Sequence, residues 1–239
     1  MVKLARYNRT LNTTYAPGVF SALELLHRRP EAICGLLVHS AGIRNTGVDK
    51  LIAGCAALGI AHEINDREVE KHSGKENCFA VAVVVKYPCA LNPAQNHVVL
   101  HNPSDMGNLG TILRTCLGFG VQDIAIIRPA ADFWDPRVAR ASMGAVYGLS
   151  VVEYDHMDDY RASFPKHQLL PFMLQASVPL ATIRPTPPFS LVFGNESRGL
   201  PEDYAALGTP VRIPHGGDID SLNLAVAAGI GIYTLFHKE

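Results

Sequence analysis

Short apolar runs alternate with amphipathic stretches along the chain, which predicts buried strands separated by helices. In the first ninety residues the strand-like runs are apolar and partly β-branched, a composition typical of strands. The expected strands are 33–39, 60–64 and 79–87, and the expected helices follow Gly18 and cover 47–58, closed by Gly59, and 66–72. Residues 1–17 are polar and predict an arm or entry loop. This half is therefore expected to be a small α/β module.

The alternation breaks at 87–96, which holds two prolines and little periodicity, and then resumes at His97. Such a break predicts a linker, with a domain boundary near residues 90 to 95. The expected later strands are 97–102, 123–129, 149–154, 168–175, 190–196 and 211–214, and the expected helices are 108–119, 136–146, 156–163 and 221–237. The sequence thus predicts an α/β protein of two domains, 1–90 and 91–239.

Composition narrows the class of protein. A chain of 239 residues with 48% hydrophobic and 18% charged residues is an ordinary globular one. No apolar run reaches the roughly 20 residues of a bilayer helix, and the first residues lack the apolar core of a signal peptide. The cysteines are widely spaced and form no CxxC pair, which argues against a zinc site or a disulfide framework. We therefore expect a cytoplasmic protein that binds neither metal nor membrane.

The charge is unevenly distributed. The net charge is −1, yet residues 1–90 carry a net +3 and residues 91–239 a net −4. Basic residues near the start, and Lys71 with Lys75, are candidates for contacts to phosphates. A mixed solvated surface explains the same residues equally well, so charge alone does not decide for an RNA partner.

Three segments place polar residues and glycines at strand ends, where open α/β sheets hold their ligands. In 101–120, Asn108 and Arg114 lie six apart, about 600° of helical rotation, so they do not share a face if both are helical. If Asn108 instead caps the helix, both side chains can edge one cleft. A cap and a surface arginine, without further function, is the simpler interpretation of this segment alone.

The other two segments carry comparable signals. In 191–200 a buried strand runs into Gly-Asn-Glu-Ser-Arg-Gly, whose glycines allow the backbone to approach a ligand, although the Gly-Lys-Ser/Thr of a P-loop is missing. Glu196 is there either a ligand-orienting or a turn carboxylate. In 212–230, Ser221 suits a helix N-cap and Asn223 the first turn of an apolar, small-residue helix. A capped core helix accounts for that pattern as well.

Taken together and in this order, the three segments closely resemble the signature motifs of the SpoU/TrmH family of RNA 2′-O-ribose methyltransferases, within the SPOUT superfamily. The motif residues are Asn108 with Arg114, then Gly194, Asn195 and Glu196 with Gly199 and Leu200, and then Ile213 and Pro214 followed by Ser221, Leu222 and Asn223. The resemblance covers about 97–239. Residues 18–87 more loosely resemble the L30e-like substrate-binding domain that often precedes this catalytic domain.

The resemblance implies a fold, a cofactor and partners. It implies a catalytic domain with a trefoil knot, in which S-adenosylmethionine binds to main-chain groups around Gly194, Ile213 and Leu222, with a further contribution from Gln175 and Ala176. It implies RNA as the substrate, with ribosomal RNA favoured over transfer RNA, and a homodimer formed through the C-terminal helix.

The resemblance also implies roles for individual residues. By the resemblance, Arg114 would lie beside the 2′-hydroxyl and act as the base. Because an arginine with a pKa above about 12 is a poor base, we expect Arg114 instead to bind the RNA phosphate and stabilise the developing oxyanion, and to accept a proton only if its pKa is strongly perturbed. Asn108 and Asn223 would position the ribose or Arg114, and Glu196 would orient the same network. Ser221 would cap the last helix and fix the cofactor pocket.

Two other functions compete with this one. A non-catalytic RNA-binding protein that kept the fold would not need all five polar motif residues, and a methyltransferase of the same fold acting on a base nitrogen fits the Asn108 and Arg114 pair less well. The loop 215–220 carries Asp218 and Asp220 near the expected site, where they would repel RNA unless they point away or contact a base edge or a basic residue.

Overall fold

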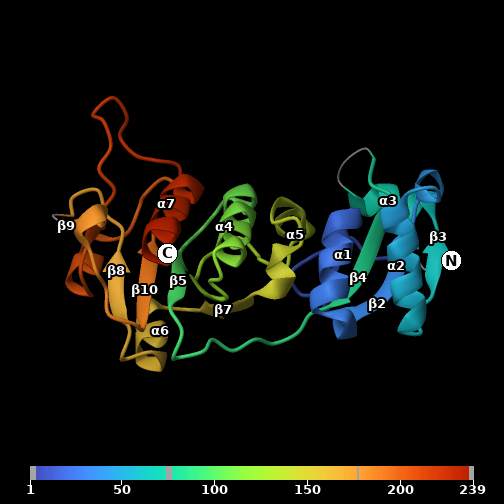
Figure 1. The fold of residues 1–239 in the computed structure, drawn as a ribbon, viewed down its shortest axis with the longest axis horizontal. Coiled ribbons are helices and arrows are strands. Elements are labelled where there is room, and N and C mark those ends of the chain that lie inside the picture. Colours follow the sequence, from blue (N-terminus) through green and yellow to red (C-terminus); the bar gives the residue numbers. More distant parts are fainter. Residues whose placement is uncertain (1–3, 74–76, 177, 237–239) are drawn as a thin grey trace. The chain divides into compact units, whose positions relative to one another are not determined.

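A computed structural model describes residues 4–73, 77–176 and 178–236, and its internal contacts divide the chain into two compact units (Figure 1). The first unit comprises the residues up to Pro88 together with Asp132–Gly148, and the second comprises Cys89–Ala131 and the residues from Leu149 onward. The chain first passes from one unit to the other at 88/89, inside the segment 87–96 that the sequence predicts to be a linker. Residues 132–148, which lie in the second domain by sequence, have most of their contacts within the first unit.

The first unit is built on a four-stranded sheet in the order β1-β4-β2-β3. Its strands are β1 (Thr13–Pro17), β2 (Ile33–Val38), β3 (His62–Ile64) and β4 (Ala80–Val85), and its helices are α1 (Val19–Arg28), α2 (Thr46–Ala57), α3 (Asp66–Ser73) and α5 (Pro136–Ala141). Strand β4 pairs antiparallel with both β1 and β2. The expected loop at 1–17 is therefore wrong for 13–17, because residues 14–17 are buried and pair with β4.

A tight turn ends α5 earlier than the sequence predicts. Met143 and Gly144 both adopt left-handed backbone conformations, with φ of 51° and 84°, which stops the helix expected over 136–146. A Cβ on Gly144 would lie 2.7 Å from the Cβ of Glu24 and 3.0 Å from the backbone of Ser21. A glycine is needed here because α1 lies directly against the turn.

The second unit holds a parallel five-stranded sheet in the order β7-β6-β5-β10-β8. Its strands are β5 (His97–His101), β6 (Asp123–Ile127), β7 (Ser150–Tyr154), β8 (Gln168–Pro171) and β10 (Phe189–Phe193), with a small parallel pair of β9 (Val178–Pro179) and β11 (Val211–Arg212). From β5 the chain continues outward through β6 and β7, and then crosses to β8 on the far side of β10. The strand order therefore reverses between β5 and β10, which is where open α/β sheets place a ligand crevice.

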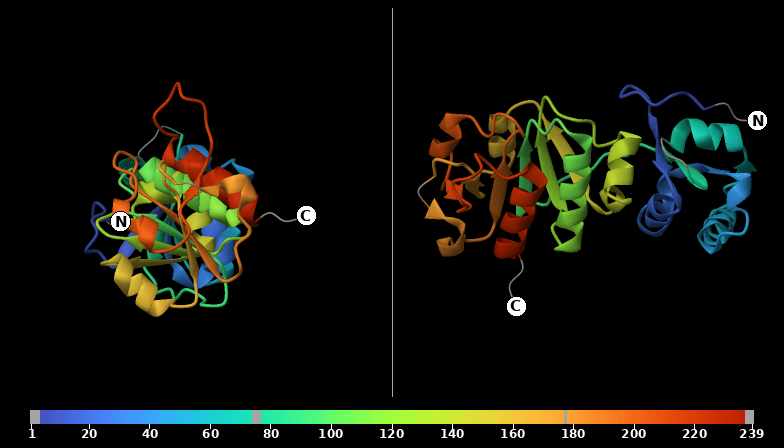
Figure 2. Two further views of the ribbon diagram at one scale, coloured as in Figure 1. Left: turned by 90° about the vertical axis from the view of Figure 1, so that its left-hand side faces the viewer. Right: turned by 90° about the horizontal axis from the view of Figure 1, so that it is seen from above.

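Helices cover both faces of this sheet, which confirms the predicted α/β class. Helices α4 (Met106–Gly118) and α7 (Leu224–Phe236) pack side by side (Figures 1 and 2). Helix α6 (Met157–Ser163) contributes Met157 and Tyr160 to a core with Val99 and Val192. Successive strand residues point to opposite faces, so Val98 and Leu191, both fully buried, belong to the other face.

Short 3₁₀ turns complete the chain. They lie at Pro30–Ala32, Ser40–Gly42, Ala145–Gly148, Leu180–Thr182 and Glu202–Ala206.

None of the helices in the described ranges has the length and apolar character needed to cross a bilayer. All five cysteines are free thiols.

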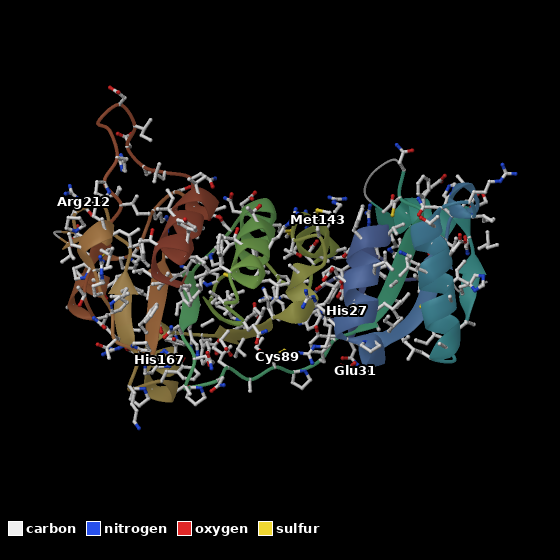
Figure 3. The ribbon with its side chains drawn as sticks, in the orientation of Figure 1. His27, Glu31, Cys89, Met143, His167 and Arg212 are labelled. Carbon is white, nitrogen blue, oxygen red and sulfur yellow. The ribbon has the colours of Figure 1, made fainter. Side chains whose placement is uncertain are left out.

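A buried polar cluster ties together the amino ends of the strands in the second unit. The ring of His97 bonds through Nδ1 to the Tyr160 hydroxyl at 2.9 Å, and that hydroxyl lies 2.6 Å from Ser190 Oγ, which in turn lies 2.8 Å from Nδ1 of His167. The remaining ring nitrogens bond to the main-chain oxygens of Asn92 and Pro93. His167 lies immediately before β8, whereas Arg212 lies near the opposite ends of the strands (Figure 3).

Candidate active site

The candidate site lies where three loops meet at the carboxyl ends of the strands. The first loop follows β5 and covers 102–105, the second follows β10 and covers 194–200, and the third follows β11 and covers 213–223. Strands β5 and β10 are parallel neighbours, with Val192 opposite Val99, so their following loops leave the same edge of the sheet.

Glu196 connects the second loop to the first. Its Oε2 accepts hydrogen bonds from the Ser104 hydroxyl at 2.7 Å and the Ser104 amide at 3.0 Å, and its Oε1 accepts one from the Asp105 amide at 3.0 Å. Partial burial acts to raise the pKa of Glu196, but these hydrogen bonds outweigh it and hold the pKa below its usual value. Glu196 therefore stays ionised and acts as an acceptor that joins two loops.

The second loop is a tight hairpin. The amides and carbonyls of Asn195 and Gly199 bond to each other in both directions, at 3.1 and 2.9 Å. Gly199 has a φ of 68°, and a Cβ on Gly194 would lie 2.2 Å from the carbonyl carbon of Gly199. Both positions therefore require glycine, one for its backbone conformation and one for close backbone contact.

Asn108 and Asn223 connect α4 to α7. Asn223 Nδ2 donates to Asn108 Oδ1 at 3.1 Å, and Asn108 Nδ2 donates to Glu196 Oε1 at 3.4 Å. One chain of hydrogen bonds thus runs through the three sequence segments that carry the motifs.

The ends of both helices differ from the sequence prediction. Asp105, not Asn108, caps α4, because Asp105 Oδ1 accepts the Asn108 amide at 2.7 Å. Asn223, not Ser221, caps α7, because its Oδ1 accepts the amides of Ala225 and Val226. Ser221 lies in the preceding loop, so α7 starts three residues later than expected; its expected last residue, 237, lies outside the described residues.

Arg114 lies on α4 with an exposed side chain. Asn108 and Arg114 are both helical, so they lie about 120° apart around the helix axis and do not share a face. The alternative in which Asn108 caps the helix is therefore wrong.

A cavity of about 210 Å³ opens beside the 194–199 hairpin. Its lining includes Gly194, Ile213 and Leu222, the three residues that the resemblance implies for cofactor binding, and also Ser221. After β8 the lining comes from Phe172, Met173 and Leu174, which the sequence analysis missed in favour of Gln175 and Ala176. The sequence signal that could have identified these three residues as cavity lining is their position directly after the apolar strand β8.

The lining suits S-adenosylmethionine in its chemistry. Apolar side chains such as Phe172, Met173 and Leu222 offer a surface for an adenine ring. Gly194 brings main-chain groups to the wall with no side chain in the way, and a Cβ there would collide with the hairpin. Arg212 and His215 line the same cavity and provide groups for a carboxylate.

Two sequence expectations concern the acidic residues of the third loop and the lack of a metal site. Asp218 and Asp220 are both exposed in the third loop. In the ranges that the structure describes, no three His, Cys, Asp or Glu side chains gather as a metal site would require.

Comparisons with known proteins show which family and which solved structures the chain is similar to. Residues 95–233 match the model of the SpoU rRNA Methylase family. The structure superposes on an rRNA methyltransferase from Sinorhizobium meliloti with bound AdoMet, at a TM-score of 0.79 and 26% identity, covering 93% of this chain and 86% of that one. That coverage extends to both units.

Two curated relatives are similar over part of their length. An uncharacterized tRNA/rRNA methyltransferase from Synechocystis is 34% identical over 139 residues, which are 57% of this chain and 51% of that protein. The 23S rRNA (guanosine(2553)-2′-O)-methyltransferase RlmP from Bacillus subtilis is 30% identical over 151 residues, 61% of this chain and 59% of that protein. The chain thus spans between half and three-fifths of these two relatives. Because the family model covers more than half of the chain, the protein belongs to the SpoU rRNA methylase family.

Proposed function

We propose that the protein transfers a methyl group from S-adenosylmethionine to the 2′-hydroxyl of a ribose in RNA. The observation that carries this proposal is the cavity lined by Gly194, Ile213 and Leu222, beside the hydrogen-bonded chain of Glu196, Asn108 and Asn223. The family membership and the likeness to a methyltransferase with bound AdoMet support it.

The chain has to bind the two substrates in line, so that the ribose O2′ bonds to the methyl carbon as the carbon–sulfur bond breaks. The leaving group is the neutral thioether S-adenosylhomocysteine, and the hydroxyl proton goes to solvent. When bound, S-adenosylmethionine supplies a methyl group on a sulfonium, which is already electrophilic. Gly194, Ile213 and Leu222 hold the cofactor through main-chain groups and apolar contacts. Positioning an oxygen for in-line attack accounts for a large part of such a rate enhancement.

The polar residues divide the remaining work. Arg114 binds an RNA phosphate and stabilises negative charge on the ribose oxygen as its proton leaves. Asn108 and Asn223 orient the ribose. Glu196 keeps the first and second loops together, which its ionised carboxylate does through the Ser104 and Asp105 hydrogen bonds. Ser221 lies in the cavity wall and contributes to the cofactor pocket.

Ribosomal RNA is the favoured substrate class, with transfer RNA as the alternative. The structural match to an rRNA methyltransferase covers 93% of the chain and so includes the first unit. By composition residues 1–90 carry a net positive charge, which favours contact with phosphates. We assign this part to substrate binding as an L30e-like domain, residues 91–239 to methyl transfer with a trefoil knot around the cofactor site, and the reaction to the cytoplasm.

A homodimer through α7 is part of the proposal. Val226, Ile230 and Tyr233 are spaced by four and three residues on one face of the helix and are 51%, 37% and 56% exposed. Phe119 extends this apolar face, with its ring 5.7 Å from that of Tyr233. A second copy would bury the same patch from both sides. Sedimentation of the wild type and of Ile230→Lys tests this, since a dimer should become monomeric.

The activity is tested with the full chain, methyl-labelled S-adenosylmethionine and unmodified ribosomal RNA. We expect saturable cofactor binding by calorimetry and transfer of label to RNA. Cofactor binding without transfer to ribosomal or transfer RNA would favour a binding protein that kept the fold. Absence of cofactor binding would refute the proposal.

A further inference from the structure

A second cavity lies on the other side of the 194–199 hairpin. It measures about 640 Å³ and is formed at the carboxyl ends of β5 and β6 by the loops that follow them, together with the end of the hairpin. His101, Asn102 and Ser104 come from the first of these segments, and Pro129, Ala130 and Ala131 from the second. None of the motif roles described above uses this cavity.

The walls of this cavity are tied together by hydrogen bonds. The amide of Asn102 donates to the Ile127 carbonyl at 2.9 Å, and the amide of Ala131 donates to the Pro103 carbonyl at 2.7 Å. Asn195 Nδ2 donates to the Asn102 carbonyl at 2.8 Å, which fixes the hairpin to the same wall. The cavity is therefore a preformed feature of the second unit, as small-molecule sites usually are.

The two cavities share a border. Asn195, Arg198 and Gly199 line both of them, so the hairpin is a common wall. The ribose of a nucleotide carries the base at C1′ and the oxygen that receives the methyl group at the neighbouring C2′. A nucleotide that reaches across this wall would place its base in the second cavity and its ribose next to the methyl donor in the first.

We propose that the second cavity binds the base of the target nucleotide after it has flipped out of its stack, with Arg198 contacting the adjoining phosphate. This inference rests on the proposed methyl transfer and adds the site of the substrate base. Enzymes that modify a base extrude it into a pocket that reads its edge and its flat face, and we extend this arrangement to an enzyme that modifies the ribose of the extruded nucleotide.

The lining has the chemistry that a base requires. Pro129, Ala130, Leu200 and Pro201 supply apolar surface for a flat ring. His101 supplies a polar edge, and its Nδ1 lies 2.6 Å from the hydroxyl of the buried Tyr204, so its Nε2 is the ring nitrogen left for a further partner. Among the described lining residues Arg198 is the cationic side chain at the shared wall, where the ribose and its phosphate would pass.

The charge state of the His101–Tyr204 pair suits recognition of a neutral base. Burial lowers the pKa of His101, so the ring is neutral near pH 7. Burial, with the nearby charge of Asp203, raises the pKa of Tyr204 to about 12, so the phenol keeps its proton. The pair thus presents polar edges without the cost of burying a charge.

The direct test is a titration of the isotopically labelled full chain, saturated with S-adenosylmethionine, with each of the four nucleoside 5′-monophosphates up to about 10 mM. We expect at least one to shift, in a saturable way, the amide resonances of the non-proline residues that line the second cavity, among them His101, Asn102, Ser104, Ala130, Ala131, Arg198, Gly199 and Leu200. Shifts confined to 172–174 and to the non-proline residues of 211–222, or no saturable shift with any of the four, would overturn the proposal.

A pair of cavity-filling variants tests the same idea through the reaction. Leu200→Trp fills the second cavity and Leu174→Trp fills the first. We expect Leu200→Trp to lower methyl transfer by about tenfold or more with cofactor affinity within about twofold of wild type, which also shows that it is folded. Leu174→Trp should instead weaken cofactor binding. His101→Phe, which keeps the ring and removes its polar edge, should lower transfer in the same direction as Leu200→Trp.

The outcomes separate this proposal from the proposed function. If the wild type transfers methyl groups to RNA and the Leu200→Trp and His101→Phe variants do so at the same rate, the base site is refuted and the proposed methyl transfer stands. Saturable nucleotide binding in the second cavity, with no transfer to any RNA, would refute the methyl transfer and leave the base site intact.

Discussion

At the scale of single residues, Glu196 shows how the structure changes the meaning of a sequence motif. A carboxylate after a buried strand was either a ligand-orienting or a turn group by sequence alone. In the structure it accepts three hydrogen bonds from Ser104 and Asp105 and one from Asn108. A group held in this way has little capacity left to take up a proton, so its role is to position the loops.

Arg114 carries the sharpest prediction for catalysis. Arg114→Ala should lower methyl transfer by about a hundredfold or more and leave cofactor affinity unchanged, because the side chain acts on the RNA and the ribose oxygen. Transfer rates and cofactor calorimetry measure the two effects separately. Arg161→Ala is the matched control, since Arg161 is an exposed arginine on α6 paired with Asp158. Equal rates for Arg114→Ala and the control would rule out the role.

Gly194 carries a prediction for cofactor binding. Gly194→Ala places a Cβ where Gly199 and Leu200 lie within 2.5 Å, so the hairpin must shift and the cavity wall with it. We expect cofactor affinity to fall by about tenfold or more. Gly118→Ala is the control, because a Cβ there meets open space at the end of α4. Unchanged affinity in Gly194→Ala would show that the hairpin does not form the cofactor wall.

At the scale of elements, the start of α7 combines a structural and a functional contact in one side chain. Asn223 caps the helix through its oxygen and reaches Asn108 through its nitrogen. The two contacts can be separated by substitution, because an aspartate keeps the oxygen and loses the donor.

The predicted outcome differs among three variants. Asn223→Ala should lower the free energy of unfolding by about 0.5–2 kcal/mol and reduce methyl transfer. Asn223→Asp should retain stability and still reduce transfer, and Ser221→Ala should leave stability close to wild type. Urea unfolding and transfer rates measure both. A loss of stability in Ser221→Ala as large as in Asn223→Ala would contradict the assignment of the cap.

The elements that the sequence predicted best are those with the strongest apolar patterns. The central strands β5, β6 and β10 are mostly apolar, and each was predicted to within one residue at its start. Strand β1 was missed because TTYAP is short and largely polar, and its burial comes from pairing with β4. The end of α5 was missed because left-handed backbone at Met143 comes from packing against α1.

The site was predictable in its parts and less so in its contacts. The three segments were found because their polar residues and glycines follow apolar strands. The choice of Asp105 over Asn108 as a cap was not readable, since both residue types cap helices and they lie three apart. The second cavity could not be predicted from the sequence, because its walls combine the segments that follow β5 and β6 with the hairpin that follows β10.

At the scale of the whole molecule, the second unit depends on histidines buried without charge. At the amino ends of the strands, the rings of His97 and His167 form hydrogen bonds to the main-chain oxygens of Asn92 and Pro93. Burial lowers the pKa of His97 to about 4 and also lowers that of His167. The unfolded chain takes up these protons below about pH 6.5, whereas the folded chain does not until lower pH.

The free energy of unfolding should therefore fall as the pH decreases from about 6.5 toward 4, by up to about 1.4 kcal/mol per pH unit for His97. Urea unfolding at several pH values, followed by circular dichroism, measures this slope. His97→Gln should reduce the slope, and His62→Gln, at an exposed histidine of β3, should not. The same slope in wild type and His97→Gln would contradict the assignment.

The central claim is that the methyl group goes to a ribose oxygen. The most direct measurement is to label RNA with methyl-labelled S-adenosylmethionine and the full chain, digest it completely with alkali and separate the products. A 2′-O-methyl group blocks cleavage at its own phosphate, so the account predicts label in alkali-resistant dinucleotides. Label found only in mononucleotides would contradict it, because the methyl group would then lie on a base.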